Sequence, residues 1–95
     1  MTENTLTPRD IRRRRLIFRA NHRGSHETDL LIGGFVNGRI AEMSDEDMDA
    51  LEEVMELKDA DLADWLTGRH EIPPHVDSPM MRAIRQAAIE GIGRA

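Results

Sequence analysis

Apolar residues recur at three- and four-residue steps along much of the chain, the spacing that places side chains on one face of an α-helix. The clearest case is SDEDMDALEEVMEL, residues 44–57, in which Met48, Leu51, Val54 and Met55 follow this spacing. No β-branched run alternates with polar residues, so we expect no β-strand. The pattern predicts an all-α protein, a compact bundle of about five short helices.

Residues that favour helix ends divide this pattern into five segments. Serine, threonine and aspartate favour the N-cap, proline favours the first turn, and glycine commonly follows the last turn. The predicted helices run from Thr7-Pro8 to about His22, from Ser25 to about Ala41, over 44–57, from Asp59 or Asp61 to Gly68, and onward from Ser78-Pro79 after the linker HEIPPHVD.

The same spacing predicts which side chains face the core. Glycines at positions 33, 34 and 38 cost the second helix about 1 kcal/mol each relative to alanine, which indicates either close helix packing or a shorter helix. Beyond the apolar residues of 44–57, the expected core contacts are Ile11, Leu16 and Phe18; Leu30, Leu31, Phe35 and Ile40, widened by Ile32 and Val36; Leu62, Trp65 and Leu66; and Met81, Ile84, Ala88 and Ile92.

The length of 95 residues suits one domain. We expect residues 1–95 to form a single helical domain, with a disordered lead at 1–7 and a frayed tail at 91–95. There is no cysteine, no run of 18 apolar residues and no secretory signal, so we expect neither a disulfide nor a membrane span. Because Met1 lies so near the domain, a bacterial cytoplasmic setting is expected rather than the mitochondrial matrix.

Charge is unevenly distributed along the chain. Residues 1–23 hold seven arginines and two acids, a net +5, whereas residues 24–95 hold six basic and sixteen acidic residues, a net −10. The run Arg12–Arg15 is a candidate nucleic-acid contact, but four consecutive helical residues point in four directions and the acidic remainder repels a polyanion. A protein partner fits better, and we expect the acids of 42–64 to form a solvated face that pairs in part with the arginines.

Few residues offer chemistry for a metal or a reaction. His22 and His26 stand four apart, a spacing that suits two zinc ligands on one helix face, with Glu27 or Asp29 as a third ligand. Gly24 lies between the histidines and is expected to break the helix, so surface histidines explain the pair and we predict no metal site. The serines lie at helix starts and no GxxxxGK[ST] motif occurs, so we expect no catalytic residue.

The stretch HRGSHETD joins the first two predicted helices. Arg23 favours a helix C-terminus, Gly24 the left-handed C′ position, and Ser25 the next N-cap. Glu27 and Asp29 complement the positive end of the second helix dipole. Helix-end chemistry accounts for these residue types and leaves open whether the stretch is also a binding surface.

The phrase RGSHE, followed by TDLLIGGF, resembles the RGxxE signature of the SdhE family of succinate dehydrogenase flavinylation factors. RLIFRANHRG is similar to the basic-aromatic lead into that motif, and LEEVMELKDADLADWLTG resembles the family's second landmark, an acidic segment that ends in Trp-Leu. The resemblance spans roughly residues 12–90. One departure is Ser25, where the family often has an apolar residue; serine is a better cap and a poorer hydrophobic anchor.

The resemblance implies a small helical assembly factor, not an enzyme, that binds the flavoprotein subunit of succinate dehydrogenase or fumarate reductase and promotes its covalent flavinylation. FAD is then the cofactor of the partner, and the factor, expected as a monomer, holds none stably. By position, Arg23, Gly24 and Glu27 would form the contact surface, with Arg19 and Asp29 beside them. A general helical adaptor and a nucleic-acid module are the alternative functions.

Overall fold

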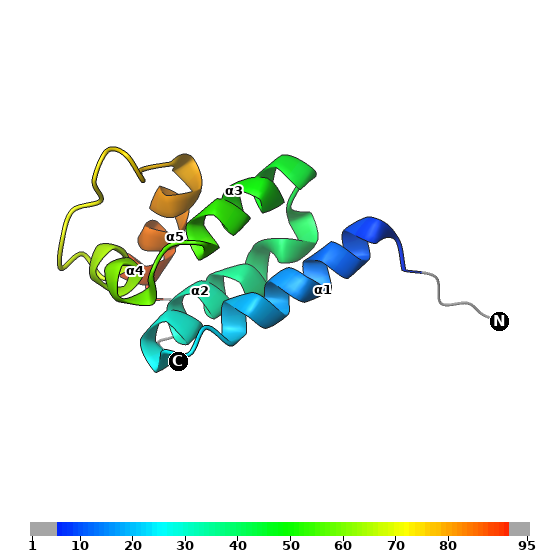
Figure 1. Cartoon of the computed structure of the whole chain (residues 1–95), viewed down its shortest axis with the longest axis horizontal. Helices are drawn as coiled ribbons and strands as arrows, with labels where there is room; N and C mark the ends of the chain where they lie inside the picture. The colour runs from blue at the N-terminus through cyan, green and yellow to red at the C-terminus, as the bar shows by residue number, and fades with distance from the viewer. Residues whose placement is uncertain (1–5, 92–95) are drawn as a thin grey trace.

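The computed structural model describes residues 6–91, which form five α-helices and one 3-10 turn (Figure 1). No strand occurs among these residues, so the predicted all-α bundle of five helices is confirmed. Expectations for residues 1–5 and 92–95, including the core contact of Ile92, lie outside the described residues. The elements are α1 (Pro8–Asn21), α2 (His26–Arg39), η1 (Ile40–Glu42), α3 (Asp45–Met55), α4 (Asp59–Leu66) and α5 (Pro79–Ile89).

Side-chain caps begin three of the helices, as predicted. At α1, Thr7 Oγ1 accepts from the Asp10 N–H at 3.1 Å, and the Asp10 carboxylate accepts from the Thr7 N–H at 3.1 Å. Ser44 and Asp47 form the same reciprocal pair at α3, and the Ser78 side chain caps α5. Each bond satisfies an N–H group that the first helical turn leaves without an intrahelical partner.

Helix α4 begins differently from the prediction. Its N-cap is Lys58, which makes no side-chain capping bond, so the expectation that Asp59 or Asp61 would cap this helix was wrong. Asp59 lies at the first helical position instead, where its carboxylate accepts a hydrogen bond from Arg23 at 2.7 Å. The predicted end is confirmed, since Gly68 follows the last turn with a φ of +82°.

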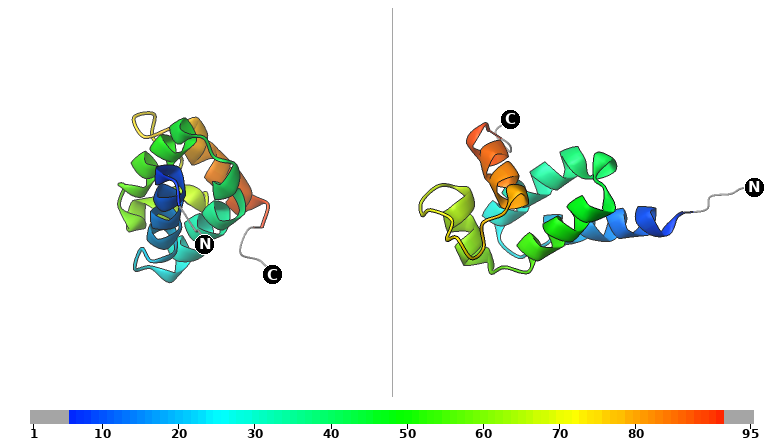
Figure 2. Two further views of the ribbon diagram at one scale, coloured as in Figure 1. Left: turned by 90° about the vertical axis from the view of Figure 1, so that its right-hand side faces the viewer. Right: turned by 90° about the horizontal axis from the view of Figure 1, so that it is seen from above.

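Helix α2 lies against α1, α4 and α5, and α3 contacts α1 and α5 (Figure 2). The apolar side chains between them form one buried cluster to which every α-helix contributes. Burial of this cluster is the main favourable contribution to folding. Its members are Leu16, Ala20, Ile32, Phe35, Val36, Ile40, Met43, Met48, Leu51, Val54, Met55, Leu62, Leu66, Met81, Ile84 and Ala87.

Three predicted core contacts were wrong, because Ile11, Phe18 and Leu30 are 40%, 61% and 45% exposed. Helix geometry explains two of these errors. Leu16 faces the core, so Phe18, two residues later, points about 200° around the helix. The same angle separates Leu30 from the buried Ile32.

Two smaller differences concern the end of α2 and the buried face of α5. Helix α2 ends at Arg39, where the chain tightens into the 3-10 turn η1, so the predicted end near Ala41 was two residues too late. In α5, Ala87 is buried, whereas Ala88, the predicted core contact, is half-buried.

Gly33 allows α1 and α2 to approach closely. A Cβ atom at this position would lie 2.9 Å from Cγ of Asn21 and 3.4 Å from the backbone oxygen of Ala20. The Asn21 amide is held in place, since its Nδ2 donates to a backbone oxygen at 2.7 Å and to Asn37 Oδ1 at 3.0 Å. No atom lies within 4 Å of a Cβ at Gly38. Close packing therefore explains Gly33 but not Gly38.

Within residues 6–91, none of the helices combines the length and the apolar character needed to cross a lipid bilayer.

Alanine substitutions at these two glycines should have opposite effects. Gly38→Ala should raise the free energy of unfolding by up to about 1 kcal/mol, because alanine favours the helix. Gly33→Ala should lower it by about 1–3 kcal/mol, because the new methyl group overlaps the Asn21 side chain. Urea denaturation followed by circular dichroism measures both. Equal stabilisation by the two variants would contradict the close approach of α1 and α2.

Candidate functional site

The candidate site lies at the corner between α1 and α2, residues 22–25. His22 is the C-cap of α1, so Arg23 occupies C′ and Gly24 follows it, one position later than predicted. The expected left-handed conformation is confirmed, with a φ of +103° at Gly24. A Cβ built on Gly24 meets no atom within 4 Å, so the chain leaves this part of the corner uncovered.

The side chain of Arg23 points into the protein and is 10% exposed. Its Nε donates to Asp59 Oδ1 at 2.7 Å, at the start of α4. Nη1 donates to the backbone oxygen of Met55 at 2.8 Å, and Nη2 to that of Leu57 at 2.9 Å. One guanidinium therefore joins the corner to the turn between α3 and α4.

Asp29 fixes the backbone of the same corner. Its Oδ1 accepts from the N–H of Arg23 at 2.7 Å, across the turn. Ser25 occupies the N-cap of α2 as predicted, but its side chain makes no capping hydrogen bond. The buried Thr28 hydroxyl donates to the Ser25 backbone oxygen at 3.3 Å. Arg23 and Asp29 are thus brought together, and both act on the conformation of the corner.

Glu27, in the first turn of α2, is exposed and binds Arg69 from the turn after α4. Arg69 Nη2 lies 3.1 Å from Glu27 Oε1, and Arg69 Nε lies 3.1 Å from Asp64 Oδ1. Hydrogen bonds to Asp64 and Glu27 raise the pKa of Arg69 above its ordinary value. The Glu27 side chain is 45% exposed, which leaves it accessible to a partner.

Sequence reasoning did not single out Arg69. The glycine before it indicates a turn, but no local signal places that turn beside α2. Arg19, the remaining predicted site residue, lies on α1 and binds Glu56, the C-cap of α3, at 3.1 Å, with both side chains exposed. It is therefore directed toward α3, whereas Glu27 is directed toward the turn after α4.

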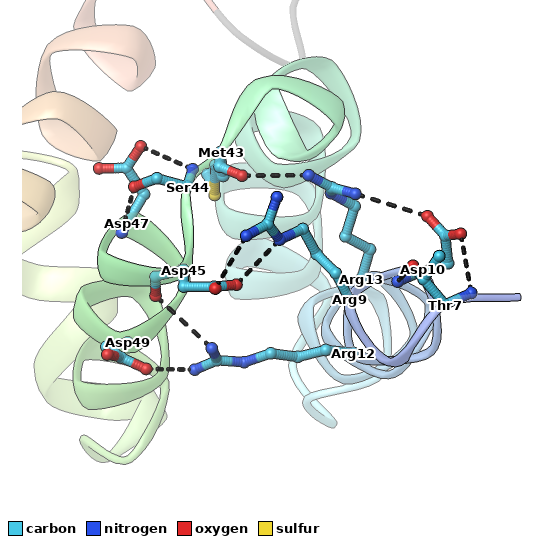
Figure 3. A network of polar contacts seen from close by, with 10 residues as sticks. All are labelled: Thr7, Arg9, Asp10, Arg12, Arg13, Met43, Ser44, Asp45, Asp47 and Asp49. Atoms are coloured by element: carbon cyan, nitrogen blue, oxygen red, sulfur yellow. Dashed lines mark hydrogen bonds and ion pairs between the residues drawn. The ribbon is translucent and has the colours of Figure 1, made fainter.

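Arg9 and part of the run Arg12–Arg15 bind acids and carbonyls of the same chain (Figure 3). Arg9 donates through Nε and Nη2 to the two oxygens of Asp45, at 3.0 and 2.9 Å. Arg12 binds Asp49 and also Glu52, the latter at 3.1 Å. The predicted pairing of the basic segment with the acidic segment is confirmed.

Arg13 turns toward the core side of α1, where its Nε donates to the Ile40 backbone oxygen at 3.1 Å and its Nη2 to that of Met43 at 3.2 Å. Arg14 and Arg15 are exposed and form no ion pair or hydrogen bond with the described residues. Only part of the run is left for an external anion, which weakens the nucleic-acid alternative.

The two histidines do not converge on a common ligand position. The His22 ring stacks on Phe18, with centroids 4.0 Å apart, and its Nδ1 lies 2.8 Å from the Phe18 backbone oxygen. His26 is exposed at the start of α2. Over residues 6–91, no three histidine, aspartate or glutamate side chains gather in a way that could hold a metal ion.

Comparisons with known proteins agree with the family resemblance found in the sequence. A family model described as "Flavinator of succinate dehydrogenase" matches residues 14–88. The "FAD assembly factor SdhE" of Acetobacter pasteurianus is 51% identical over 75% of this chain and 65% of its own length. The protein of the same description from Ralstonia nicotianae is 41% identical, over 77% of this chain and 76% of its own length.

A eukaryotic relative is more distant. "Succinate dehydrogenase assembly factor 2, mitochondrial" of Komagataella phaffii is 34% identical over 68% of this chain. The aligned part spans slightly under two thirds of the Acetobacter protein and about a third of the Komagataella protein.

The contacts of Arg23 and Glu27 predict that substitutions at these two motif residues have different effects on the free energy of unfolding. Arg23→Met should lower the free energy of unfolding by about 3 kcal/mol, because it leaves Asp59 and two carbonyls without their donors. Glu27→Ala should change it by less than about 1 kcal/mol, since it removes one exposed ion pair. Thermal unfolding followed by circular dichroism distinguishes the two. Similar melting temperatures for both variants would argue against Arg23 as an internal anchor.

Acid should weaken the attachment of α1 to α3. Hydrogen bonds from Arg9 hold the pKa of Asp45 below its ordinary value of 3.8. The pair therefore stabilises the fold fully above about pH 4, and this contribution is lost as the pH falls through the lower folded-state pKa. Asp45→Asn should be less stable than the parent at pH 7, and the difference should vanish at strongly acidic pH.

Urea denaturation at a series of pH values measures this difference. Glu71→Gln serves as the control, because Glu71 is exposed and forms no hydrogen bond or ion pair with the part of the chain that the structure describes. A stability difference for Asp45→Asn that persists unchanged in acid would contradict the role of the Arg9 pair.

Proposed function

Since the chain belongs to the family described as flavinator of succinate dehydrogenase, we propose that it binds the flavoprotein subunit of succinate dehydrogenase, or the related subunit of fumarate reductase, and promotes its covalent flavinylation. The bacterial relatives called FAD assembly factors support this proposal. They also support a bacterial cytoplasmic setting.

The corner is the proposed contact surface, and one observation carries this assignment: the exposed Glu27 lies beside an uncovered glycine on a backbone that Arg23 and Asp29 hold in place. Arg23 contributes by fixing the corner, because its guanidinium is occupied by Asp59 and two carbonyls. Gly24 lets the partner's backbone approach. The exposed Phe18 and Arg19 would form the neighbouring part of the contact surface on α1, although Arg19 is directed toward Glu56 rather than toward Glu27.

The proposed mechanism is one of binding rather than chemistry. Docking of the corner favours the conformer of the flavoprotein in which its histidine and the flavin are aligned, so the linkage forms within the flavoprotein itself. No residue of this chain is given a catalytic role. FAD is the cofactor of the partner and is not held stably by this chain, which acts as a monomer.

The test uses cells that lack this gene and measures covalent flavin by fluorescence of the flavoprotein band in a denaturing gel. The band should be lost in the deletion, restored by the wild-type gene, and not restored by Glu27→Ala. Glu46→Ala is the matched control, since Glu46 is equally an exposed first-turn glutamate, but on α3. It should restore the band fully.

Immunodetection of the flavoprotein subunit shows whether its amount is constant across the strains. An unchanged fluorescent band in the deletion strain would reject the flavinylation role and favour a general helical adaptor. Full restoration by Glu27→Ala would reject the corner as the working surface while leaving the function in place.

A further inference from the structure

Arg85 on α5 has no hydrogen-bond acceptor among the described residues. Its side chain is half-buried, and its Nε is buried without a partner. No ion pair joins it to any residue of the described chain. A guanidinium nitrogen that is removed from water without an acceptor is unfavourable, so this arrangement calls for an explanation.

The other arginines with mostly buried side chains are all satisfied. Arg12, Arg13 and Arg23 are 26%, 22% and 10% exposed, and each binds carboxylates or backbone oxygens. The exposed Arg82, three residues before Arg85 on the same helix, also binds a carboxylate, that of Asp77. Among the described arginines that are not exposed, Arg85 therefore differs from Arg12, Arg13 and Arg23 in its lack of an acceptor.

The position of Arg85 connects it to the corner. A Cβ atom added at Gly68 would lie 3.7 Å from Nη2 of Arg85, so the guanidinium is next to the turn that follows α4. The next residue of that turn, Arg69, binds Glu27 at 3.1 Å. Arg85, the turn and Glu27 thus form a continuous series of neighbours, and Gly68 has no side chain that would cover the guanidinium.

We infer that Arg85 is a second contact for the flavoprotein subunit and binds a carboxylate of that subunit. The inference rests on the proposed function. A carboxylate can accept two hydrogen bonds from one guanidinium, and here it would accept them at the Nη side beside Gly68, because the buried Nε is out of its reach. Arg69 is shared by two carboxylates, Glu27 and Asp64, so the neighbouring cluster carries a net negative charge. A carboxylate, with one negative charge, is therefore favoured over the pyrophosphate of FAD, which carries two.

The test is a titration of the purified chain with the purified flavoprotein subunit, followed by calorimetry. Arg85→Met retains most of the apolar stem and should weaken binding by about tenfold or more, because the carboxylate of the partner loses its donors. The affinity of Arg85→Lys should lie between those of Arg85→Met and wild type, since lysine keeps the positive charge but lacks the paired N–H donors of the guanidinium. Arg82→Met, the matched control on the same helix, should bind within about twofold of wild type.

Thermal unfolding of the free variants separates a binding role from a structural one. Arg85→Met should melt at or above the wild-type temperature, because it removes the unsatisfied Nε. A melting temperature that falls together with the affinity would assign Arg85 to the fold and overturn the inference. So would wild-type affinity in Arg85→Met.

Two further outcomes are distinguishable. A wild-type chain that binds no flavoprotein subunit would reject the proposed function and the Arg85 contact together, whereas normal wild-type and normal Arg85→Met binding would reject only the contact. A parallel titration with FAD alone tests the nature of the ligand. Binding of FAD that depends on Arg85 would overturn the carboxylate assignment.

Discussion

The guanidinium of Arg23 is the interaction on which the rest of the site depends. It lies where the corner meets the turn between α3 and α4, and it donates to Met55 and Leu57 oxygens and to the Asp59 carboxylate. The last carbonyls of one helix and an acid in the first turn of the next both attract a cation. The motif therefore combines an internal anchor, Arg23, with a surface that the anchor presents.

The basic N-terminal segment and the acidic segment that follows it pair largely with each other within the fold. Arg9, Arg12 and Arg19 of α1 pair in order with acids spaced along α3 and its C-cap. Figure 3 shows the pairs of Arg9 with Asp45 and of Arg12 with Asp49. Each exposed pair contributes little on its own. Together they specify which helix α1 lies beside, because a shift along α3 would place these arginines opposite the wrong side chains.

Local signals predicted the starts of α1 and α3, because a cap depends on residues within four positions, as at Thr7 and Ser44, but they did not predict the start of α4 at Lys58 or the end of α2. They did not predict which face of α1 is buried, since that depends on where α2 lies, and Phe18 was misassigned for this reason. The motif residues were identified by resemblance to a family. Arg69 and Arg85 join the site through the tertiary position of the turn after α4, for which no short-range signal exists.

The contacts of Arg23 also determine at which stage of folding the corner can adopt its final conformation. Its three side-chain bonds span 32, 34 and 36 positions of the sequence. Closing such a loop requires α3 and the start of α4 to be in place before these bonds can form. An isolated α1–α2 hairpin would carry the motif without its anchor. The corner is thus a property of the nearly complete chain, and a truncated or partly synthesised product would not present it to a partner.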